Sequence, residues 1–281
     1  MFLLSYSSPV NFTEAHSLGY TFYDIFFKLR YCSKQEENKI INAISKMQEV
    51  GWFVSSRGEW HLVVCIMSKS PEDFKKSLDK VLEILGEKVI DYDFFIVIEA
   101  SQLQYKEVLE DTGSKKPKNT YLGKQAEIKL KKADATILEK LATNCRCSLV
   151  DLAEQTNLTI ERVRYAIKKL ENLGIIQAYK PLINTNKLGY IWNIMLIQFH
   201  NCPEKKKQEF MDFLKNLKQV FYIVKGVGNW SLMTEFHTKN IQELDNIRSI
   251  ISSKFENIIR DERLVQVINE HKCVFLPKLN V

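Results

Sequence analysis

The sequence predicts an α+β protein in which two ferredoxin-like βαββαβ domains flank a winged helix-turn-helix. Three observations lead to this fold class. The segment Ala133 to Tyr179 has the periodicity of three short helices followed by a strand. The residues before and after this segment repeat one apolar pattern at an offset of 170 residues. In each copy of the repeat, strand and helix patterns follow in the order β-α-β-β-α-β.

The repeat is visible from short matching stretches. SLGYTFYDIFFKL, beginning at Ser17, matches KLGYIWNIMLIQF, beginning at Lys187. The same offset aligns GEWHL, from Gly58, with GNWSL, from Gly228. Identity is low but the apolar pattern agrees throughout, so the two stretches are copies of one domain.

The predicted domains follow in order along 281 residues. They are a wing-like N-terminal connection (1–17), a first ferredoxin-like domain (18–105), a polar linker (106–125), the winged helix-turn-helix (126–186) and a second ferredoxin-like domain (187–281). The connection resembles residues 180–190 but has no helix-turn-helix before it. Either that module was lost, or it lies upstream of this sequence.

The elements of the two copies are predicted from strand alternation and helical spacing. In the first copy they are 21–29, 36–47, 51–56, 59–67, 72–85 and 94–99; in the second they are 191–199, 205–217, 220–227, 230–237, 241–255 and 264–268. Both helices of a copy should cover one sheet face and leave the other apolar. The linker, with its polar stretch 111–119, should be a mobile loop, and a helix is expected from residue 123.

The central module has capping signals at its predicted helix ends. Ser148 and Asp151 have the spacing of a capping box at the start of the second helix. Thr159 can cap the third helix, and Gly174 can end it in a left-handed conformation. The strand that follows, at 175–179, is the predicted wing.

The third helix, 159–173, has one apolar side and one basic, aromatic-bearing side. Arginine and lysine reach phosphates and guanine edges from a helix in the major groove, whereas a solvated face is the ordinary alternative. The candidate DNA-binding residues are Ser148, Thr159, Arg162, Arg164, Tyr165, Lys168, Lys169 and Lys180.

Charge is distributed unevenly along the chain. The net charge is +6, and residues 115–187 contain 15 Lys or Arg against 7 Asp or Glu, an excess of eight. The rest of the chain therefore sums to −2. This excess favours a polyanionic partner, double-stranded DNA, for the central module.

These residues resemble a known family. The stretch ILEKLATNCRCSLVDLAEQTNLTIERVRYAIKKLENLGIIQAYKPLIN is similar to the DNA-binding domain of the Lrp/AsnC (feast/famine) regulators, with Cys145 a departure from the usual small residue. The two repeat copies are similar to the family's ferredoxin-like RAM domain. The resemblance implies a sequence-specific transcription regulator whose RAM-like domains serve assembly and the sensing of an amino-acid or other small-molecule effector.

The resemblance also implies an effector site at one turn. VFYIVKGVGNWSL, at 220–232, looks like the family's β2–β3 turn, which indicates Gly226, Gly228, Asn229 and Trp230 as effector-binding residues. Asn229 stands where the family usually has aspartate, which argues for a weak or absent amino-acid response. The glycines are equally typical of a hairpin that needs positive φ.

No catalytic or metal motif is found, and no cofactor is predicted. Gly226-x-Gly228 lacks the rest of a dinucleotide fingerprint, and Cys145-x-Cys147 has no second pair for zinc. Scattered cysteines and the lack of a membrane-length apolar run favour a cytoplasmic, non-membrane protein. Two alternatives remain open: an enzyme like the sirohaem decarboxylases, which resemble this family, and a partner regulator that does not itself bind DNA.

Two apolar sheet faces in one chain predict pairing of the RAM-like domains. The pairing is either within the chain, as a pseudo-dimer, or between chains, as a symmetric homo-oligomer. We expect a compact monomer that dimerises through a remaining surface.

Overall fold

The computed structural model describes residues 6–106, 120–123, 127–274, 276 and 279. Its helices and strands follow in one order, with the bounds β1 Tyr6–Thr13, η1 His16–Leu18, β2 Thr21–Leu29, α1 Lys34–Lys46, β3 Val50–Gly58, β4 Leu62–Ser68, α2 Pro71–Leu85, η2 Gly86–Lys88, β5 Val89–Gln102, β6 Thr120–Leu122, α3 Lys132–Thr143, α4 Leu149–Thr156, α5 Ile160–Asn172, β7 Ile176–Ile183, η3 Thr185–Leu188, β8 Ile191–Phe199, α6 Glu204–Asn216, β9 Val220–Gly228, β10 Leu232–Thr238, α7 Ile241–Phe255 and β11 Ile259–Cys273. Both copies of the repeat have the predicted βαββαβ order.

Eight strands of the two copies close into one barrel. The hydrogen-bonded order is β2-β4-β3-β11-β8-β10-β9-β5, and β5 pairs again with β2. The first copy contributes β5-β2-β4-β3 and the second contributes β11-β8-β10-β9. The short strand β6 adds to the outside of the ring beside β5. Closure removes the free strand edges that two separate sheets would expose.

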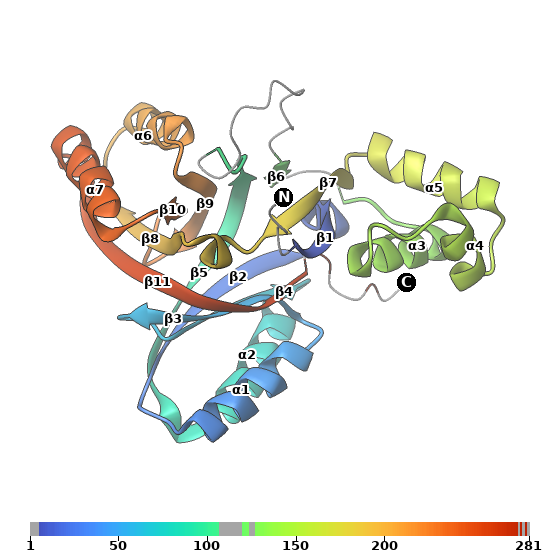
Figure 1. Ribbon diagram of the computed structural model, residues 1–281, viewed down its shortest axis with the longest axis horizontal. Helices are drawn as coiled ribbons and strands as arrows, with labels where there is room; N and C mark the ends of the chain where they lie inside the picture. The colour runs from blue at the N-terminus through green and yellow to red at the C-terminus, as the bar shows by residue number, and fades with distance from the viewer. Residues whose placement is uncertain (1–5, 107–119, 124–126, 275, 277–278, 280–281) are drawn as a thin grey trace.

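The apolar residues of the strands divide between two sides of the barrel wall. The outward-facing set of the first copy packs under α1 and α2, and that of the second copy packs under α6 and α7. The inward-facing set, which includes Phe26, Phe95, Ile194 and Val265, fills the barrel interior. The two helical layers lie on different sides of the barrel (Figure 1). The sheet faces left open in the prediction are therefore buried against each other.

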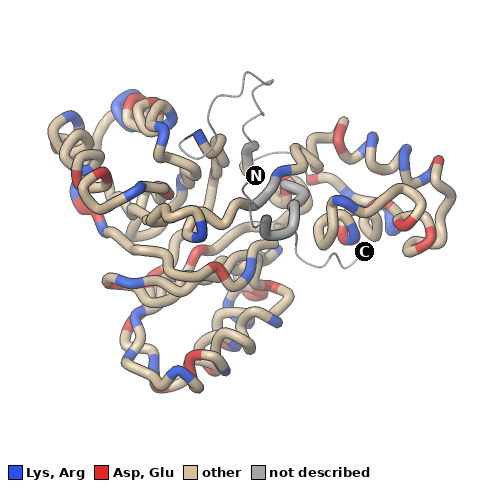
Figure 2. The backbone as a smooth tube through the Cα atoms, in the orientation of Figure 1, with Lys and Arg blue, Asp and Glu red and all other residues tan. Residues whose placement is uncertain are grey.

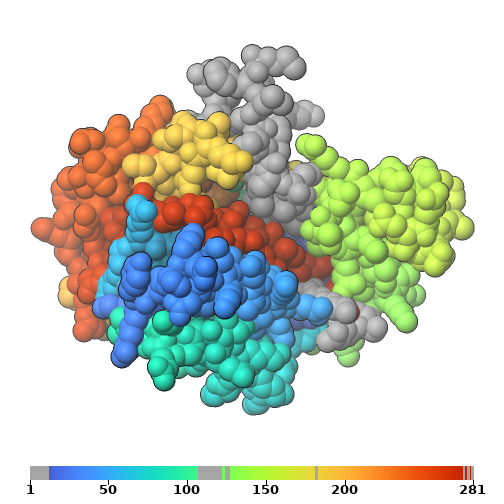
Figure 3. All heavy atoms as spheres, turned by 60° about the horizontal axis from the view of Figure 1, so that its bottom comes forward, coloured from blue at the N-terminus to red at the C-terminus, as the bar shows by residue number. Residues whose placement is uncertain are grey.

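The last strand of each copy joins the two halves and is longer than predicted. Residues 89–97 of β5 pair with β2 of the same copy, and residues 95–102 pair with β9 of the other. In the same way β11 pairs with β8 and then with β3. In the space-filling view the red C-terminal segment lies against the blue first copy (Figure 3). The predicted strands at 94–99 and 264–268 include only part of each pairing.

The N-terminal connection is itself a strand. β1 pairs antiparallel with β7, the strand that follows α5, in a separate two-stranded ribbon. The segment predicted as wing-like thus completes the wing.

In the linker, residues 120–122 form β6, whereas the predicted loop at 107–119 lies outside the described residues. The helix expected from residue 123 is wrong for 127–131, because α3 begins at Lys132.

The helical module sits beside one end of the barrel, on the right of Figure 1. Its core includes Ile137, Leu141, Leu152 and Val163, all buried. Beyond β11, the backbone N–H of Leu279 donates to a carboxylate oxygen of Glu139 in α3 at 2.6 Å. Among the described residues, no helix is both long and apolar enough to cross a bilayer.

Candidate nucleic-acid interface

Local capping fixes the helix that the sequence predicts at 159–173. The Thr159 side chain accepts from the backbone N–H of Arg162 at 3.2 Å, so α5 begins at Ile160. Ser148 and Asp151 form the predicted capping box of α4. Asn157, at φ 53°, makes the left-handed turn between α4 and α5. Ser148 and Thr159 are thus helix caps, each exposed at the start of a helix.

The outer face of α5 presents a small group of polar and aromatic side chains. Arg164, Tyr165 and Lys168 are exposed, and Tyr165 is 64% exposed. Basic positions are spaced along α5 at the outer side of the module (Figure 2). This face is free to meet a groove.

Two other predicted residues are engaged inside the module. Asp134 of α3 is fully buried and accepts from Arg162 at 2.7 Å and from Lys169 at 2.6 Å. Burial acts to raise the pKa of Asp134, but the bonds with Lys169 and Arg162 outweigh it and lower the pKa. Arg162 and Lys169 therefore hold α5 on α3, with about a third of each side chain still exposed.

Lys180 lies on β7, opposite Val10 of β1. It is half-buried, and burial lowers its pKa to about 8. Arg164 and Lys168 are more exposed than Lys180 and are therefore better placed to contact phosphates.

The glycines of the predicted effector turn lie where the two copies join. Gly226 pairs with Val97, and Gly228 pairs with Phe95, across the β5–β9 junction. A Cβ on Gly226 would lie 2.7 Å from Cζ of Phe95, and one on Gly228 would lie 2.7 Å from the Phe94 carbonyl oxygen. Glycine here permits close approach of two backbones. An effector-binding role for these residues stays a prediction.

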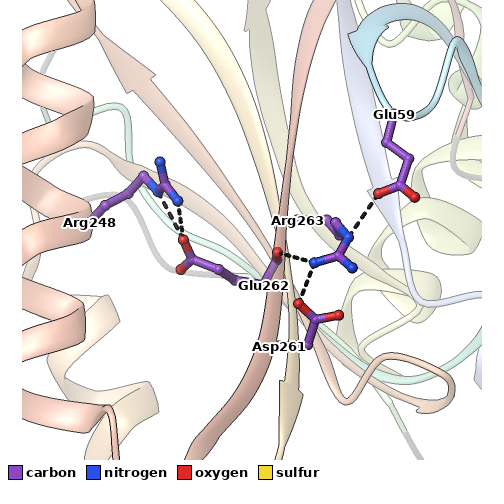
Figure 4. Close-up of polar contacts among 5 residues, drawn as sticks. All are labelled: Glu59, Arg248, Asp261, Glu262 and Arg263. Carbon is purple, nitrogen blue, oxygen red and sulfur yellow. Dashed lines mark hydrogen bonds and ion pairs between the residues drawn. The ribbon is translucent and has the colours of Figure 1, made fainter.

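Asn229 and Glu59, which depart from the family's aspartate, make equivalent contacts at the two junctions. Asn229 donates to an Asp93 carboxylate oxygen at 3.0 Å. Glu59 pairs with Arg263 at 2.8 Å, and Arg263 also contacts Asp261 (Figure 4). Under the offset of 170, Asn229 corresponds to Glu59 and Arg263 to Asp93. Each departure thus pairs with a residue of the other copy. Trp230 is buried in the barrel interior.

A cavity that sequence reasoning missed lies inside the barrel, next to the β1–β7 ribbon. Its volume is about 90 Å³. Its lining comes from both copies, from Tyr105 after β5 and from Ile183 at the end of β7. The polar and titratable lining residues are Asp24, Cys65, Gln102, Tyr105, Tyr222, Glu235, His237, Glu270 and Cys273. A polar residue on an inward-facing strand position was the signal available in the sequence, at Asp24 and Glu235.

Burial perturbs the titration of the inner groups. Burial, followed by the neighbouring Glu270 and Asp24 carboxyls, raises the pKa of Glu235 to about 8, against a bond from the Trp192 indole. Burial raises the pKa of Asp24 to about 6 and lowers that of His237 to about 3. Within the described residues, no group of His, Cys, Asp and Glu side chains is arranged to hold a metal ion.

Comparison with known proteins connects the helical module to DNA-binding proteins. Residues 130–177 match the family described as winged helix-turn-helix DNA-binding. An HTH-type transcriptional regulator of Pyrococcus abyssi is 29% identical over 130 residues, which cover 46% of this chain and 86% of that protein. The regulator FL11 of Pyrococcus furiosus is 24% identical over 120 residues, 43% of this chain and 78% of the relative. The chain thus contains a winged helix-turn-helix module and is similar over about half its length to HTH-type transcriptional regulators.

Solved structures are similar to the whole chain or to about half of it. The sirohaem decarboxylase NirDL aligns over 99% of this chain and 80% of its own, with a TM-score of 0.62 and 14% identity. At that identity the likeness shows the fold alone. E. coli AsnC aligns over 50% of this chain and 94% of its own, with a TM-score of 0.43 and 21% identity.

Proposed function

We propose that this chain is an Lrp/AsnC-like regulator that reads a DNA sequence by placing α5 in the major groove. The observation that carries the proposal is the outer face of α5, where Arg164, Tyr165 and Lys168 are exposed together. Arginine and lysine there reach guanine edges or phosphates, and the tyrosine supplies apolar contact with bases or sugars.

The pair Arg162 and Lys169 has a positioning role in this proposal. Their bonds to buried Asp134 fix the angle of α5 against α3. Each keeps about a third of its side chain exposed, so either can add a backbone phosphate contact at the edge of the groove. Ser148 and Thr159 stand at helix starts, where backbone N–H groups favour phosphate.

The described part of the chain carries one recognition helix for two RAM-like copies. A palindromic site then takes two chains, with half-sites about one helical turn or a multiple apart. Within each chain the two copies form a pseudo-dimer, in the place of a dimer of two single-copy subunits. The supporting contacts are the strand pairs β3–β11 and β5–β9.

Duplex DNA is the proposed partner and the cytoplasm the proposed location. The barrel cavity itself does not suit a tetrapyrrole, because about 90 Å³ is small for a macrocycle and the lining carboxyl groups would repel tetrapyrrole carboxylates. The remaining alternative is a regulator that acts only by contacting another DNA-binding protein.

A DNA-binding measurement tests the proposal. Duplexes selected from a random pool by the purified chain would be titrated with wild type and with R164A/K168A. We expect the double variant to lose about 1–3 kcal/mol of binding free energy and to show a shallower salt dependence. The matched control is K205A/K206A, which removes the same charge from exposed positions of α6.

Equal loss in the two double variants would mean that general charge, and not α5, determines binding. No selected duplex at all, from a chain with intact helicity, would leave the partner-regulator alternative in its place.

A further inference from the structure

The barrel cavity collects carboxyl groups without a cation to neutralise them. Asp24 and Glu235 are 4% and 5% exposed, and Glu270 lines the same cavity from an exposed position at its rim. No lysine or arginine is found among the described residues that line it. Burying acidic groups together is unfavourable unless they are protonated or neutralised by a cation.

Aromatic side chains form the walls around these carboxyls. Trp52 donates to Glu270 at 3.0 Å and Trp192 donates to Glu235 at 2.9 Å. The two indole rings lie 6.2 Å apart between ring centroids. Both indole N–H groups are therefore used on carboxylates, and aromatic rings next to carboxylates are a common surrounding for an organic cation.

His237 supplies a second, independent sign of a ligand. It is 3% exposed, lines the cavity and is surrounded by the rings of Tyr105, Trp192 and Phe221. Its Nε2 has no hydrogen-bond partner among the described residues. Buried polar atoms are normally satisfied, so the missing partner is expected from an occupant of the cavity. A neutral imidazole nitrogen can accept a hydrogen bond from an ammonium group.

The lining of the cavity disfavours several classes of ligand. An anion is disfavoured because the described lining residues include no lysine or arginine. A zwitterionic amino acid would bring its carboxylate among the carboxyls. A bare metal ion lacks a ligand cluster in the described part of the chain. A cavity of about 150 Å³ in another protein holds benzene, so about 90 Å³ suits a compact molecule.

We propose that the cavity binds a small protonated amine, with Glu235 and Asp24 as counter-charges, His237 as acceptor and the Trp52–Trp192 pair as the entrance. The amine enters past Glu270 and its alkyl part lies against the apolar lining. The site is formed by both copies, since Asp24 and Trp52 belong to the first and Trp192, Glu235 and His237 to the second.

The site also contacts the connection to the helical module. The backbone N–H of Ile183, the last residue of β7, donates to the Tyr105 hydroxyl at 3.4 Å. Tyr105 stacks on Phe221, with ring centroids 4.0 Å apart, and lines the cavity. An amine beside these rings can therefore shift the strand that follows α5. This step rests on the proposed DNA reading, whereas amine binding itself does not.

The test uses the full chain without DNA. Calorimetric titration and thermal unfolding would be measured with butylamine and putrescine, and with butyrate and L-leucine as controls of similar size. We expect at least one amine to bind and to raise the unfolding midpoint, with no effect of the controls. Affinity should rise with pH by up to about tenfold per unit below the Glu235 pKa of about 8, because the amine binds the ionised carboxyl.

The titratable groups that line the cavity together with Glu235 are Asp24, Cys65, Tyr105, Tyr222, His237, Glu270 and Cys273. Glu235→Gln keeps the shape and should weaken amine binding by tenfold or more. Glu262→Gln, which removes a carboxyl paired with Arg248 outside the lining, should leave it unchanged (Figure 4). Asp24→Asn is the second cavity variant if Glu235→Gln does not fold.

The proposal is overturned if neither amine binds at millimolar concentration, if butyrate or L-leucine binds as well as the amines, or if amine affinity is equal in the Glu235→Gln and Glu262→Gln proteins. A DNA-binding failure would leave these measurements untouched, so the two hypotheses are tested separately.

Discussion

At the scale of single residues, buried carboxyl groups have two opposite roles in this protein. Asp134 is buried with two cations in contact, Arg162 and Lys169, so its charge is stabilised. Glu235 is buried with other acids near it, so its charge is destabilised. Asp134 therefore holds α5 against α3, whereas Glu235 is a buried acidic group in the barrel with no cation beside it among the described lining residues.

Asp134→Ala should lower the free energy of unfolding by about 2–3 kcal/mol, because hydrogen bonds to a charged group are lost and two cations remain half-buried. This loss of stability should disappear at low pH. Because the pKa of Asp134 is lowered in the folded protein, its carboxylate stabilises the fold at pH values above its pKa in the unfolded chain. That stabilisation is lost as the pH falls through the pKa of Asp134 in the folded protein. Urea unfolding at several pH values measures the loss of unfolding free energy and its dependence on pH. Asp79→Ala, which removes an exposed pair with Lys75, is the control and should cost about 0.5 kcal/mol or less.

Glu235→Gln should stabilise the empty protein above neutral pH. Burial raises the pKa of Glu235 in the folded protein to about 8, so the folded state holds this proton more tightly than the unfolded chain. The protonated carboxyl therefore stabilises the fold at pH values below its pKa in the unfolded chain, and this stabilisation is lost as the pH rises through about 8. The variant should therefore unfold at a higher temperature than wild type at pH 8 and at a similar temperature at pH 5. An equal difference at both pH values would contradict the raised pKa.

At the scale of elements, the strand junctions decide how the two copies meet. Glycine at 226 and 228 lets β9 approach β5, and Gly58 lets β3 approach β11, where a Cβ would lie 3.0 Å from the Leu264 carbonyl oxygen. Side-chain pairs then fix the register, Asn229 with Asp93 and Glu59 with Arg263. Close backbone approach and cross-strand pairing thus act together.

Gly226→Ala should destabilise the fold by about 1–3 kcal/mol or more, since its Cβ would overlap the Ile96 carbonyl and the Phe95 ring. Chemical unfolding monitored by tryptophan fluorescence would measure the loss, because Trp60 and Trp230 lie in the barrel interior. Val227→Ala, at the neighbouring and 59% exposed position, should change stability by no more than about 0.5 kcal/mol. Similar effects of the two substitutions would argue against a tight junction.

At the scale of the whole molecule, one chain contains both halves of a closed barrel. Every barrel strand has two neighbours within the chain, so a second chain has no strand edge of the ring to add to. The strand pairs β3–β11 and β5–β9 lie within the chain, which supports the proposed pseudo-dimer. Under the proposed function, a second chain on a palindromic DNA site would associate through a different surface.

At protein concentrations where sedimentation shows a monomer, the chain should therefore still unfold in one cooperative transition, with a midpoint that does not change on further dilution. A barrel formed between two chains would instead unfold at a lower temperature on dilution, by mass action. Differential scanning fluorimetry at several concentrations, with sedimentation at each, makes the comparison. Loss of the cooperative transition in samples that sediment as monomers would show that intermolecular contacts hold the barrel together.

The local elements and their order could be predicted from the amino-acid sequence. Period-two and helical patterns predicted both βαββαβ copies, and short-range caps at Ser148, Thr159 and Gly174 predicted the helical module closely. Such signals act over a few residues, so a single sequence contains them completely. The exposed face of α5 was found for the same reason, since a helix fixes which residues share a side.

Contacts between residues that are far apart in the sequence became visible only in the folded chain. The ion pairs of Arg162 and Lys169 with Asp134 join residues 28 and 35 positions apart, and no local pattern shows them. The approach of β5 to the turn glycines is likewise a contact between distant segments. The cavity needed Asp24, Glu235 and His237 to come together from two copies. These contacts depend on barrel closure, and closure follows from burying two apolar sheet faces and four strand edges at once, which no local pattern encodes.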